Sequence, residues 1–191
     1  MCLDNGNYSR ILKVAKESFN TRGYRSVTIQ EIAEQLGMSK KTIYQYFSSK
    51  EEMAEAVVLA SMERLEESTK KFDHVGQEDP LRVVKEVLIT VREETIQFGP
   101  LFLMDMEKYL PDLAARFKEF RQERKEKGIQ LLQKLQDEGV IAHIPVPLLA
   151  HILSTCMHAL ATRDAEQELH YSRLHVLDTF MDIFCKGIST N

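Results

Sequence analysis

Residues 28–47 form the segment that most constrains the fold, because helix start and stop signals follow one another closely there. Thr28 is a good helix N-cap, and Glu31, three residues later, completes a capping box. Gly37 stands where a left-handed residue ends a helix without steric cost. The segment therefore predicts a helix that begins at Thr28 and ends before Gly37, followed by a tight turn.

A second helix is expected directly after that turn, over residues 39–47. Ser39 is its N-cap, and Ile43 and Phe47 face the core. Two short helices joined by a tight glycine turn predict a helix-turn-helix, a motif that places its second helix in the major groove of DNA. The outward residue types suit DNA, since lysines neutralise phosphates, hydroxyls bond phosphate oxygens and glutamine pairs with adenine. The expected DNA contacts are Thr28, Met38, Ser39, Lys40, Lys41, Thr42, Tyr44, Gln45, Tyr46 and Lys50.

The distribution of charge supports this interpretation. The whole chain has a formal net charge of −4, which by itself argues against nucleic acid. Residues 9–50, however, contain eight Lys or Arg and three Glu, whereas residues 51–191 contain 17 basic and 25 acidic residues. A basic N-terminal segment followed by an acidic remainder of the chain indicates that only the N-terminal segment contacts DNA. The simpler alternative is that adjacent lysines form an ordinary solvated face.

Composition and motifs exclude several other classes of protein. With 43% hydrophobic and 28% charged residues, the chain can bury a core, and no apolar run is long enough to span a membrane. The N-terminus does not resemble a secretory signal, so we expect a cytoplasmic protein. Three widely spaced cysteines, Cys2, Cys156 and Cys185, predict neither a disulfide framework nor a zinc finger. Without a phosphate-binding glycine loop or a hydrolase motif, we expect no enzymatic activity, no metal and no cofactor.

Helical periodicity continues along the rest of the chain, which predicts an all-α fold of about nine helices. Ser49 and Glu52 predict a capping box at the start of a long helix over residues 49–71. After a polar break at residues 72–80, Asp79 and Pro80 open the next helix. Gly99 and Pro100 break the pattern again, and a short helix is expected from there to residue 109. Further helices are expected over residues 111–137, 145–162 and 171–186. Residues 140–144 are too short and isolated to build a sheet.

A set of residues over positions 7–65 is highly specific when taken together. It comprises Ile11-Leu12-Lys13-Val14-Ala15, Phe19, Gly23-Tyr24, Thr28-Ile29-Gln30-Glu31-Ile32-Ala33, Leu36-Gly37-Met38-Ser39, Thr42-Ile43-Tyr44, Tyr46-Phe47 and Lys50-Glu51. Through these residues the chain resembles the tetracycline-repressor (TetR) family of transcription regulators. The resemblance implies an all-α homodimer, with a three-helix DNA-binding domain at residues 1–52 and a helical ligand-binding and dimerisation domain at residues 53–191. It also implies that the last two long helices form a four-helix bundle across the dimer.

Candidate residues in the second domain follow from its apolar patterns. A pocket for a hydrophobic ligand is expected among Phe98, Phe102, Met104, Met106, Tyr109 and Phe120, although each of these also suits an ordinary core. The last two helices have apolar residues on two flanks, and the second flank suggests a further copy of the chain. The expected interface residues are Leu149, Ile152, Leu153, Cys156, Leu177, Phe180, Met181 and Phe184. The alternative is a hairpin buried within a monomer.

Two histidines of the second-last helix, His151 and His158, are the nearest approach to a metal motif. A metal site on one helix needs closer spacing than seven residues, so we expect both rings at solvent or at an interface.

We therefore predict a sequence-specific DNA-binding transcriptional regulator, acting as a ligand-responsive repressor. It would bind a palindromic double-stranded operator as a homodimer and respond to an unknown small-molecule effector. Three alternatives stay open: an activator, a DNA-binding protein without an effector, and a helical protein-binding adaptor.

Overall fold

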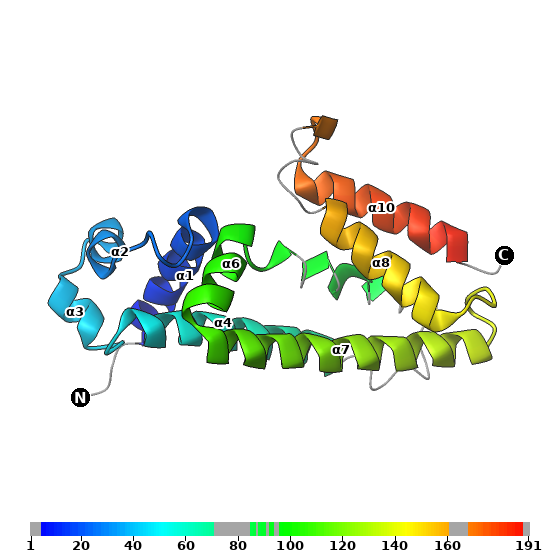
Figure 1. Cartoon of the computed structure of the whole chain (residues 1–191), viewed down its shortest axis with the longest axis horizontal. Coiled ribbons are helices and arrows are strands. Elements are labelled where there is room, and N and C mark those ends of the chain that lie inside the picture. Colours follow the sequence, from blue (N-terminus) through cyan, green and yellow to red (C-terminus); the bar gives the residue numbers. More distant parts are fainter. Residues whose placement is uncertain are drawn as a thin grey trace. The chain divides into compact units, whose positions relative to one another are not determined.

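The computed structural model describes residues 5–70, 85–86, 88–90, 92–93, 96–160 and 168–188. Eight helices have defined bounds within these residues (Figure 1): α1 (Asn5–Arg22), α2 (Ile29–Leu36), α3 (Lys40–Tyr44), α4 (Lys50–Thr69), α6 (Pro100–Tyr109), α7 (Pro111–Asp137), α8 (Val146–Leu160) and α10 (Arg173–Ile188). Residues 85–86, 88–90, 92–93, 96 and 168–169 are also helical, and the described residues contain no strand beyond an isolated bridge at Ile141. These observations confirm the all-α prediction. The expected break at residues 72–80, with its Asp79–Pro80 helix start, lies outside the described residues.

Within the described part of the chain, no helix is both long enough and apolar enough to span a membrane.

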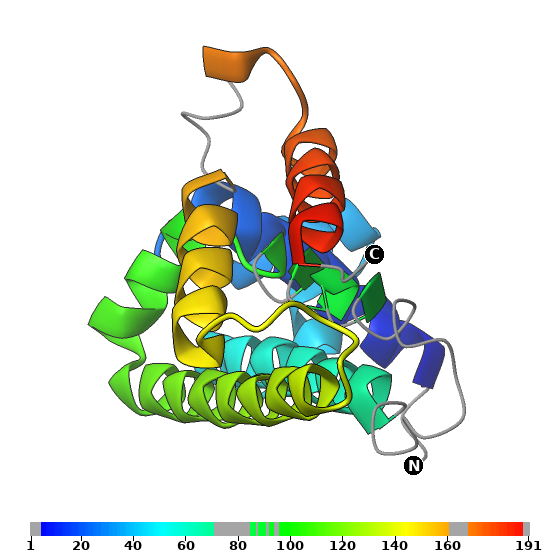
Figure 2. The same ribbon diagram turned by 90° about the vertical axis from the view of Figure 1, so that its right-hand side faces the viewer.

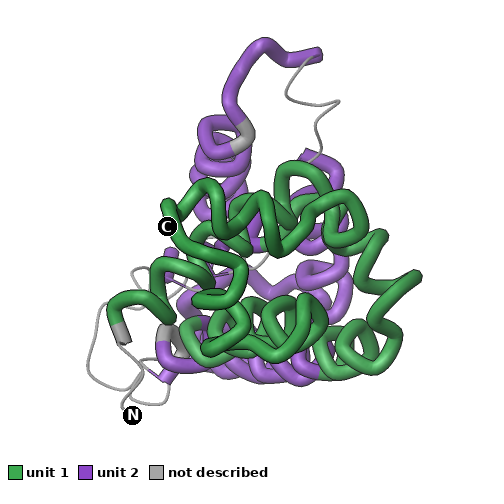
Figure 3. Tube along the Cα trace, turned by 90° about the vertical axis from the view of Figure 1, so that its left-hand side faces the viewer, with its two compact units in different colours: residues 1–64, 98–119 green, residues 65–97, 120–191 purple. Residues whose placement is uncertain are grey.

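The chain divides into two compact units (Figure 3). Unit 1 comprises Met1–Arg64 and Phe98–Glu119, and unit 2 comprises Leu65–Gln97 and Phe120–Asn191. This division differs from the boundary expected after residue 52, because α6 and the start of α7 pack with the N-terminal helices. The periodicity of a helix shows which face is buried but not which neighbour covers it, so the sequence did not reveal this arrangement.

Aromatic rings fill the core of unit 1 where α6 lies against α1 (Figure 1). The Phe19 ring of α1 stacks on Phe102 of α6 with centroids 5.4 Å apart. Phe98 packs edge-on against Phe102 and against Phe117 of α7, at 5.3 and 5.2 Å. Offset and edge-to-face ring pairs stabilise a core beyond their buried area. These contacts explain why α6 belongs to the same unit as the predicted helix-turn-helix.

Unit 2 has a separate apolar core that joins the second half of α7 to α8 and α10. Figure 2 shows α8 and α10 side by side. Gly139 ends α7 with a φ of +73°, as the sequence predicted. The loop that follows is held by Gln136, whose side-chain amide donates to the carbonyls of Ala142 and Ile144.

Candidate nucleic-acid interface

The first helix of the predicted motif begins as expected. Thr28 is the N-cap of α2: its Oγ1 accepts the Glu31 N–H at 3.2 Å, and Glu31 Oε2 accepts the Thr28 N–H at 2.7 Å. Arg22 of α1 donates to the other carboxylate oxygen of Glu31 at 2.7 Å. Hydrogen bonds from Arg22 and then Thr28 lower the pKa of Glu31 to about 2. The capping box is therefore confirmed, and the same carboxylate also ties α2 to α1.

The turn between α2 and α3 depends on Gly37. This residue has φ +65° and ψ +29°, and the N–H groups of Gly37 and Met38 bond the carbonyls of Glu34 and Ala33. Such paired bonds satisfy the last carbonyls of a helix. A Cβ at Gly37 would meet nothing within 4 Å, so glycine is favoured there by its torsion angles and not by crowding.

The second helix is shorter than the sequence predicted. Ser39 caps α3 by accepting the Thr42 N–H at 3.0 Å, but α3 ends at Tyr44 and not at residue 47. Beyond Tyr44 the backbone tightens, since the N–H groups of Gln45 and Tyr46 bond carbonyls only three residues back. Residues 45–46 therefore form a turn, and the prediction of a helix over residues 39–47 is wrong at its C-terminal end.

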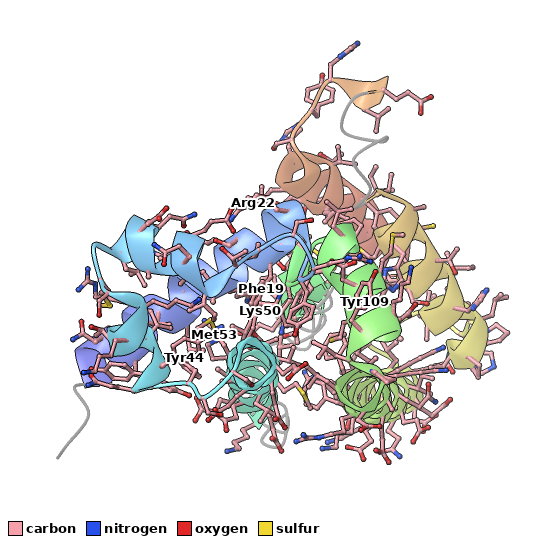
Figure 4. All side chains as sticks on the ribbon, turned by 60° about the vertical axis from the view of Figure 1, so that its left-hand side comes forward. Phe19, Arg22, Tyr44, Lys50, Met53 and Tyr109 are labelled. Carbon is pink, nitrogen blue, oxygen red and sulfur yellow. The ribbon has the colours of Figure 1, made fainter. Side chains whose placement is uncertain are left out.

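The short helix presents a polar surface above two buried anchors. Ile43 and Phe47 are buried in the core of unit 1, and the Tyr8 ring stacks on Phe47 with centroids 5.1 Å apart. Tyr44, which is labelled in Figure 4, is 46% exposed. The Lys40 ammonium lies 5.8 Å from the centroid of the Tyr44 ring. The expected DNA-contact residues with exposed side chains are Thr28, Ser39, Lys40, Lys41, Tyr44 and Gln45. Those with partly exposed side chains are Met38, Thr42, Tyr46 and Lys50.

Lys50 differs from the rest of this set. Its ammonium donates to the carbonyls of Tyr24, Val27 and Arg25, at 2.9, 3.0 and 3.4 Å, and lies 4.2 Å from the centroid of the Tyr24 ring. Burial lowers the pKa of Lys50. We expected a phosphate contact, but the structure uses this ammonium to hold the start of α4 against the connection between α1 and α2.

The start of α4 also departs from prediction. Ser49 Oγ accepts the Glu52 N–H at 3.0 Å, which is one half of the expected capping box. The Glu52 carboxylate bonds the N–H and hydroxyl of Ser48, and not the N–H of Ser49. The reciprocal bond thus forms one residue earlier.

Helix α6 binds the connection between α1 and α2 through residues that sequence reasoning missed. Asp105 Oδ2 accepts the Arg25 N–H at 2.8 Å, and the Arg25 guanidinium donates to the Tyr109 hydroxyl. Asn20 Oδ1 accepts the Gly99 N–H at 3.1 Å. About eighty residues separate the partners in sequence, and no local pattern links them. These bonds fix the position of α6 relative to the helix-turn-helix.

The expected ligand-pocket residues differ in their surroundings. Phe98, Phe102 and Met106 are buried in the core of unit 1, which supports the alternative that these residues are ordinary core. Met104 is 65% exposed. Tyr109 bonds Arg25, and the half-buried Phe120 lies beneath Arg124, whose guanidinium carbon is 5.4 Å from the ring centroid.

Four of the residues expected at a dimer interface lie instead in the core of unit 2. Leu149, Leu153, Leu177 and Met181 are buried in the core of unit 2, so within one chain they are not free to contact a partner subunit. Ile152 is exposed, and Cys156, Phe180 and Phe184 are partly exposed. The large exposed apolar residues of α8 and α10 are Leu148, Ile152, Leu174 and Ile183.

Among the described histidines and cysteines, His158 and Cys185 have shifted pKa values. His158 Nε2 lies 2.6 Å from an Arg121 nitrogen, and burial followed by the Arg121 charge lowers the pKa of His158. Burial raises the pKa of the Cys185 thiol, which makes its thiolate scarce. Among the described residues, no group of three or more metal-ligating side chains comes together.

Comparison with known proteins agrees with this geometry. Residues 11–57 match the model of the family described as bacterial regulatory proteins, tetR family. The chain is 26% identical over 187 residues to YvaF of Bacillus subtilis, an uncharacterized HTH-type transcriptional regulator, and the match covers 95% of each protein. It is 31% identical over 86 residues to the HTH-type transcriptional regulator AcrR of Shigella flexneri, a match that covers 45% of this chain and 40% of AcrR.

Solved structures share the fold. The TetR family regulator PfmR from Thermus thermophilus superimposes with a TM-score of 0.68 at 20% identity, over 95% of this chain and all of PfmR. A TetR regulator from Chloroflexus aurantiacus gives 0.70 at 20% identity, over 97% of this chain and 98% of that one. A family match over α1 to α4 therefore coincides with a capped helix-turn-helix and a shared all-α fold. Residues 11–57 therefore form a DNA-binding helix-turn-helix domain of the tetR family of bacterial regulatory proteins, and the chain is a transcriptional regulator.

Proposed function

We propose that this regulator is a repressor that binds a palindromic operator as a homodimer and leaves it when a small-molecule effector binds. The observation that most supports operator binding is the exposed polar surface of α3, mounted on the buried Ile43 and Phe47. Lys40 and Lys41 would neutralise phosphates or bond guanine, and Gln45 would pair with the N6 and N7 edge of adenine. Exposed Tyr44 would bond a phosphate oxygen. Flanking contacts are proposed for Thr28, Met38, Ser39, Thr42 and Tyr46.

Operator binding is tested by fluorescence anisotropy with DNA from the region flanking the gene. Tyr44→Ala should weaken binding to all sequences alike, whereas Lys41→Ala or Gln45→Ala should change the preference at a base position. Lys118→Ala removes an exposed lysine of α7 and is the matched control. If the double variant Lys41→Ala/Tyr44→Ala binds DNA with unchanged affinity, α3 is not the recognition helix.

The homodimer proposal rests on the exposed apolar side chains of α8 and α10. Leu148, Ile152, Leu174 and Ile183 extend outward from helices whose other faces already form the core of unit 2. A two-fold dimer would cover such a surface with the same surface of a second copy. Two exposed copies of α3 would then read two half-sites of a palindrome.

Light scattering at micromolar concentration tests the dimer. The unchanged protein should be dimeric, and Ile183→Asp should shift it to monomer. Met104→Asp is the matched control, because Met104 and Ile183 are both 65% exposed but only Ile183 lies on the proposed surface. A monomeric unchanged protein, or dissociation by both variants alike, would contradict the proposal.

Effector response would act through α6. We place effector binding and dimerisation in residues 53–191, and within that range α6 is bonded to the α1–α2 connection by Asp105 and Tyr109. A ligand with different affinities for two positions of α6 would shift the population of DNA-binding molecules. A promoter–reporter assay separates a repressor from an activator, since deletion of the regulator should raise expression in the first case and lower it in the second.

A further inference from the structure

We propose that Lys16, Ser61 and Arg64 form a binding site for the anionic group of a small organic acid. The three side chains lie in unit 1, Lys16 on α1 and the other two on α4. As the site of the effector, this inference rests on the proposed function above. As a binding site, it stands without that function.

Two cations converge on one buried hydroxyl. Lys16 Nζ donates to Ser61 Oγ at 3.2 Å, and an Arg64 nitrogen donates to the same oxygen at 3.3 Å. Ser61 is 2% exposed, Lys16 is half-buried and Arg64 is exposed. The cluster thus extends from the protein interior at Ser61 to solvent at Arg64, which gives a ligand a route of entry.

The two cations have no carboxylate partner among the residues that the structure describes. Among the described residues, neither Lys16 nor Arg64 takes part in a salt bridge. Burial, and then repulsion by Arg64, lower the pKa of Lys16 to about 8. A partly desolvated charge beside a like charge is unfavourable, and proteins normally pair such groups. An anion placed between the two cations would supply the missing pairing.

Every group in the cluster is a donor. The ammonium and the guanidinium have no acceptor atoms, and Ser61 Oγ already accepts a bond from each of them. In the described part of the chain, no acceptor for the Ser61 hydroxyl proton is found. A ligand that completes this arrangement must be an acceptor, and charge-assisted bonds favour an ionised one.

The surroundings favour an acid that also has an apolar part. Lys16 Nζ lies 5.3 Å from the centroid of the Phe98 ring, and Phe98 is a buried member of the aromatic core of unit 1. Apolar walls with a few convergent polar groups are typical of small-molecule sites. The position of Phe98, next to the start of α6, would also let an occupant affect the helix that is bonded to the α1–α2 connection.

The test uses four probes on the full chain: decanoate, acetate, decanol and inorganic phosphate. Binding is measured by isothermal titration and by NMR of 13C-labelled lysine side chains. Decanoate should bind and should raise the pKa of Lys16 toward its ordinary value. Decanol has the same alkyl chain without the charge, and it should neither bind nor change the pKa of Lys16. Binding of phosphate in place of decanoate would assign the anion site to phosphate esters.

Lys16→Met should weaken anion binding at least about tenfold, because it removes a charge-assisted hydrogen bond. Lys13→Met removes an exposed lysine of the same helix and should bind like the unchanged protein. Without ligand, Lys16→Met should melt at the same or a higher temperature, since it relieves desolvation and repulsion, and Lys16→Arg should retain binding. Undiminished anion binding in Lys16→Met, or no response of the Lys16 signal to any of the three anions, would overturn the site.

DNA anisotropy separates this inference from the proposed function. Release of DNA by the bound anion in the unchanged protein but not in Lys16→Met would identify the site as the effector site. Anion binding at Lys16 without release of DNA would refute its role as effector site and leave the anion site intact. If the protein binds its operator normally but the NMR signal of Lys16 responds to none of the anions, the anion site is refuted and the proposed operator binding is not.

Discussion

Gly99 offers the sharpest test of how α6 is seated. It is the N-cap of α6, with φ −70° and ψ 151°, torsion angles that alanine also adopts readily. A Cβ at this position would lie 2.3 Å from the backbone oxygen of Asn20 and 3.0 Å from its carbonyl carbon. Gly99→Ala therefore isolates the close approach of two backbones from any cost in torsion angle.

The magnitude follows from that geometry. An ordinary contact between such atoms needs 3.4 Å or more, so α6 or the end of α1 must move by about 1 Å. The Asn20 oxygen belongs to the backbone of a packed helix and has no rotamer to change. Overpacking of this kind costs about 1–3 kcal/mol. For a chain of this length each kcal/mol lowers the melting temperature by about 2–4 °C, so we expect a decrease of about 2–12 °C.

The assay is thermal unfolding followed by circular dichroism, with DNA affinity as a second measurement. Gly128→Ala is the matched control, because a Cβ at Gly128 inside α7 would meet nothing within 4 Å. It should stabilise the protein, by up to about 1 kcal/mol, through helix propensity. Gly99→Ala should also weaken DNA binding, since movement of α6 strains the bonds from Asp105 and Tyr109 to Arg25. A melting temperature of Gly99→Ala within about 1 °C of the unchanged protein would refute the rigid seating of α6.

Three further changes probe the helix-turn-helix. Because the pKa of Glu31 is lowered to about 2 in the folded protein, the ionised carboxylate contributes to stability above pH 4.5, and this contribution is lost as the pH falls toward 2. Urea unfolding should therefore show that the difference in stability between the unchanged protein and Glu31→Gln decreases across that pH range. A constant difference would contradict the assignment. Lys50→Met should lower the free energy of unfolding by about 1–3 kcal/mol by leaving three carbonyls without their donor, and a change near zero in denaturant melts would show that these bonds contribute nothing. Gly37→Ala should cost about 1 kcal/mol through its positive φ alone, so a stabilised variant in the same melts would contradict that account.

The helix-turn-helix was predictable because its signals are local. The capping box of Thr28 and Glu31 and the left-handed Gly37 involve atoms within four residues of one another, and the structure shows both. The buried positions of Ile43 and Phe47 followed from helical spacing. The bounds of α6 and α7, set by Gly99, Pro100 and Pro111, were also predictable from local helix breakers.

Side chains that find distant partners were less predictable. Lys50 was assigned to phosphate from its position, yet its ammonium bonds the α1–α2 connection more than twenty residues away in sequence. Likewise, Leu149 and Ile152 lie on the same apolar helix and differ only in which flank the other helices of unit 2 cover. Periodicity marks both as candidates for burial and does not distinguish a core from a subunit interface.

The sequence by itself thus determined the all-α class, the helix-turn-helix and the basic N-terminal segment, since torsion preferences, caps and charge act over a few residues. Tertiary structure decided that α6 joins the unit of the helix-turn-helix, through Asp105, Tyr109 and Gly99. It also decided that Lys16 and Arg64 both bond Ser61 and that neither cation forms a salt bridge within the described residues. Such contacts depend on the packing of helices that are distant in sequence. The energy of that packing is non-directional and spread over many contacts, so no local sequence pattern predicts it.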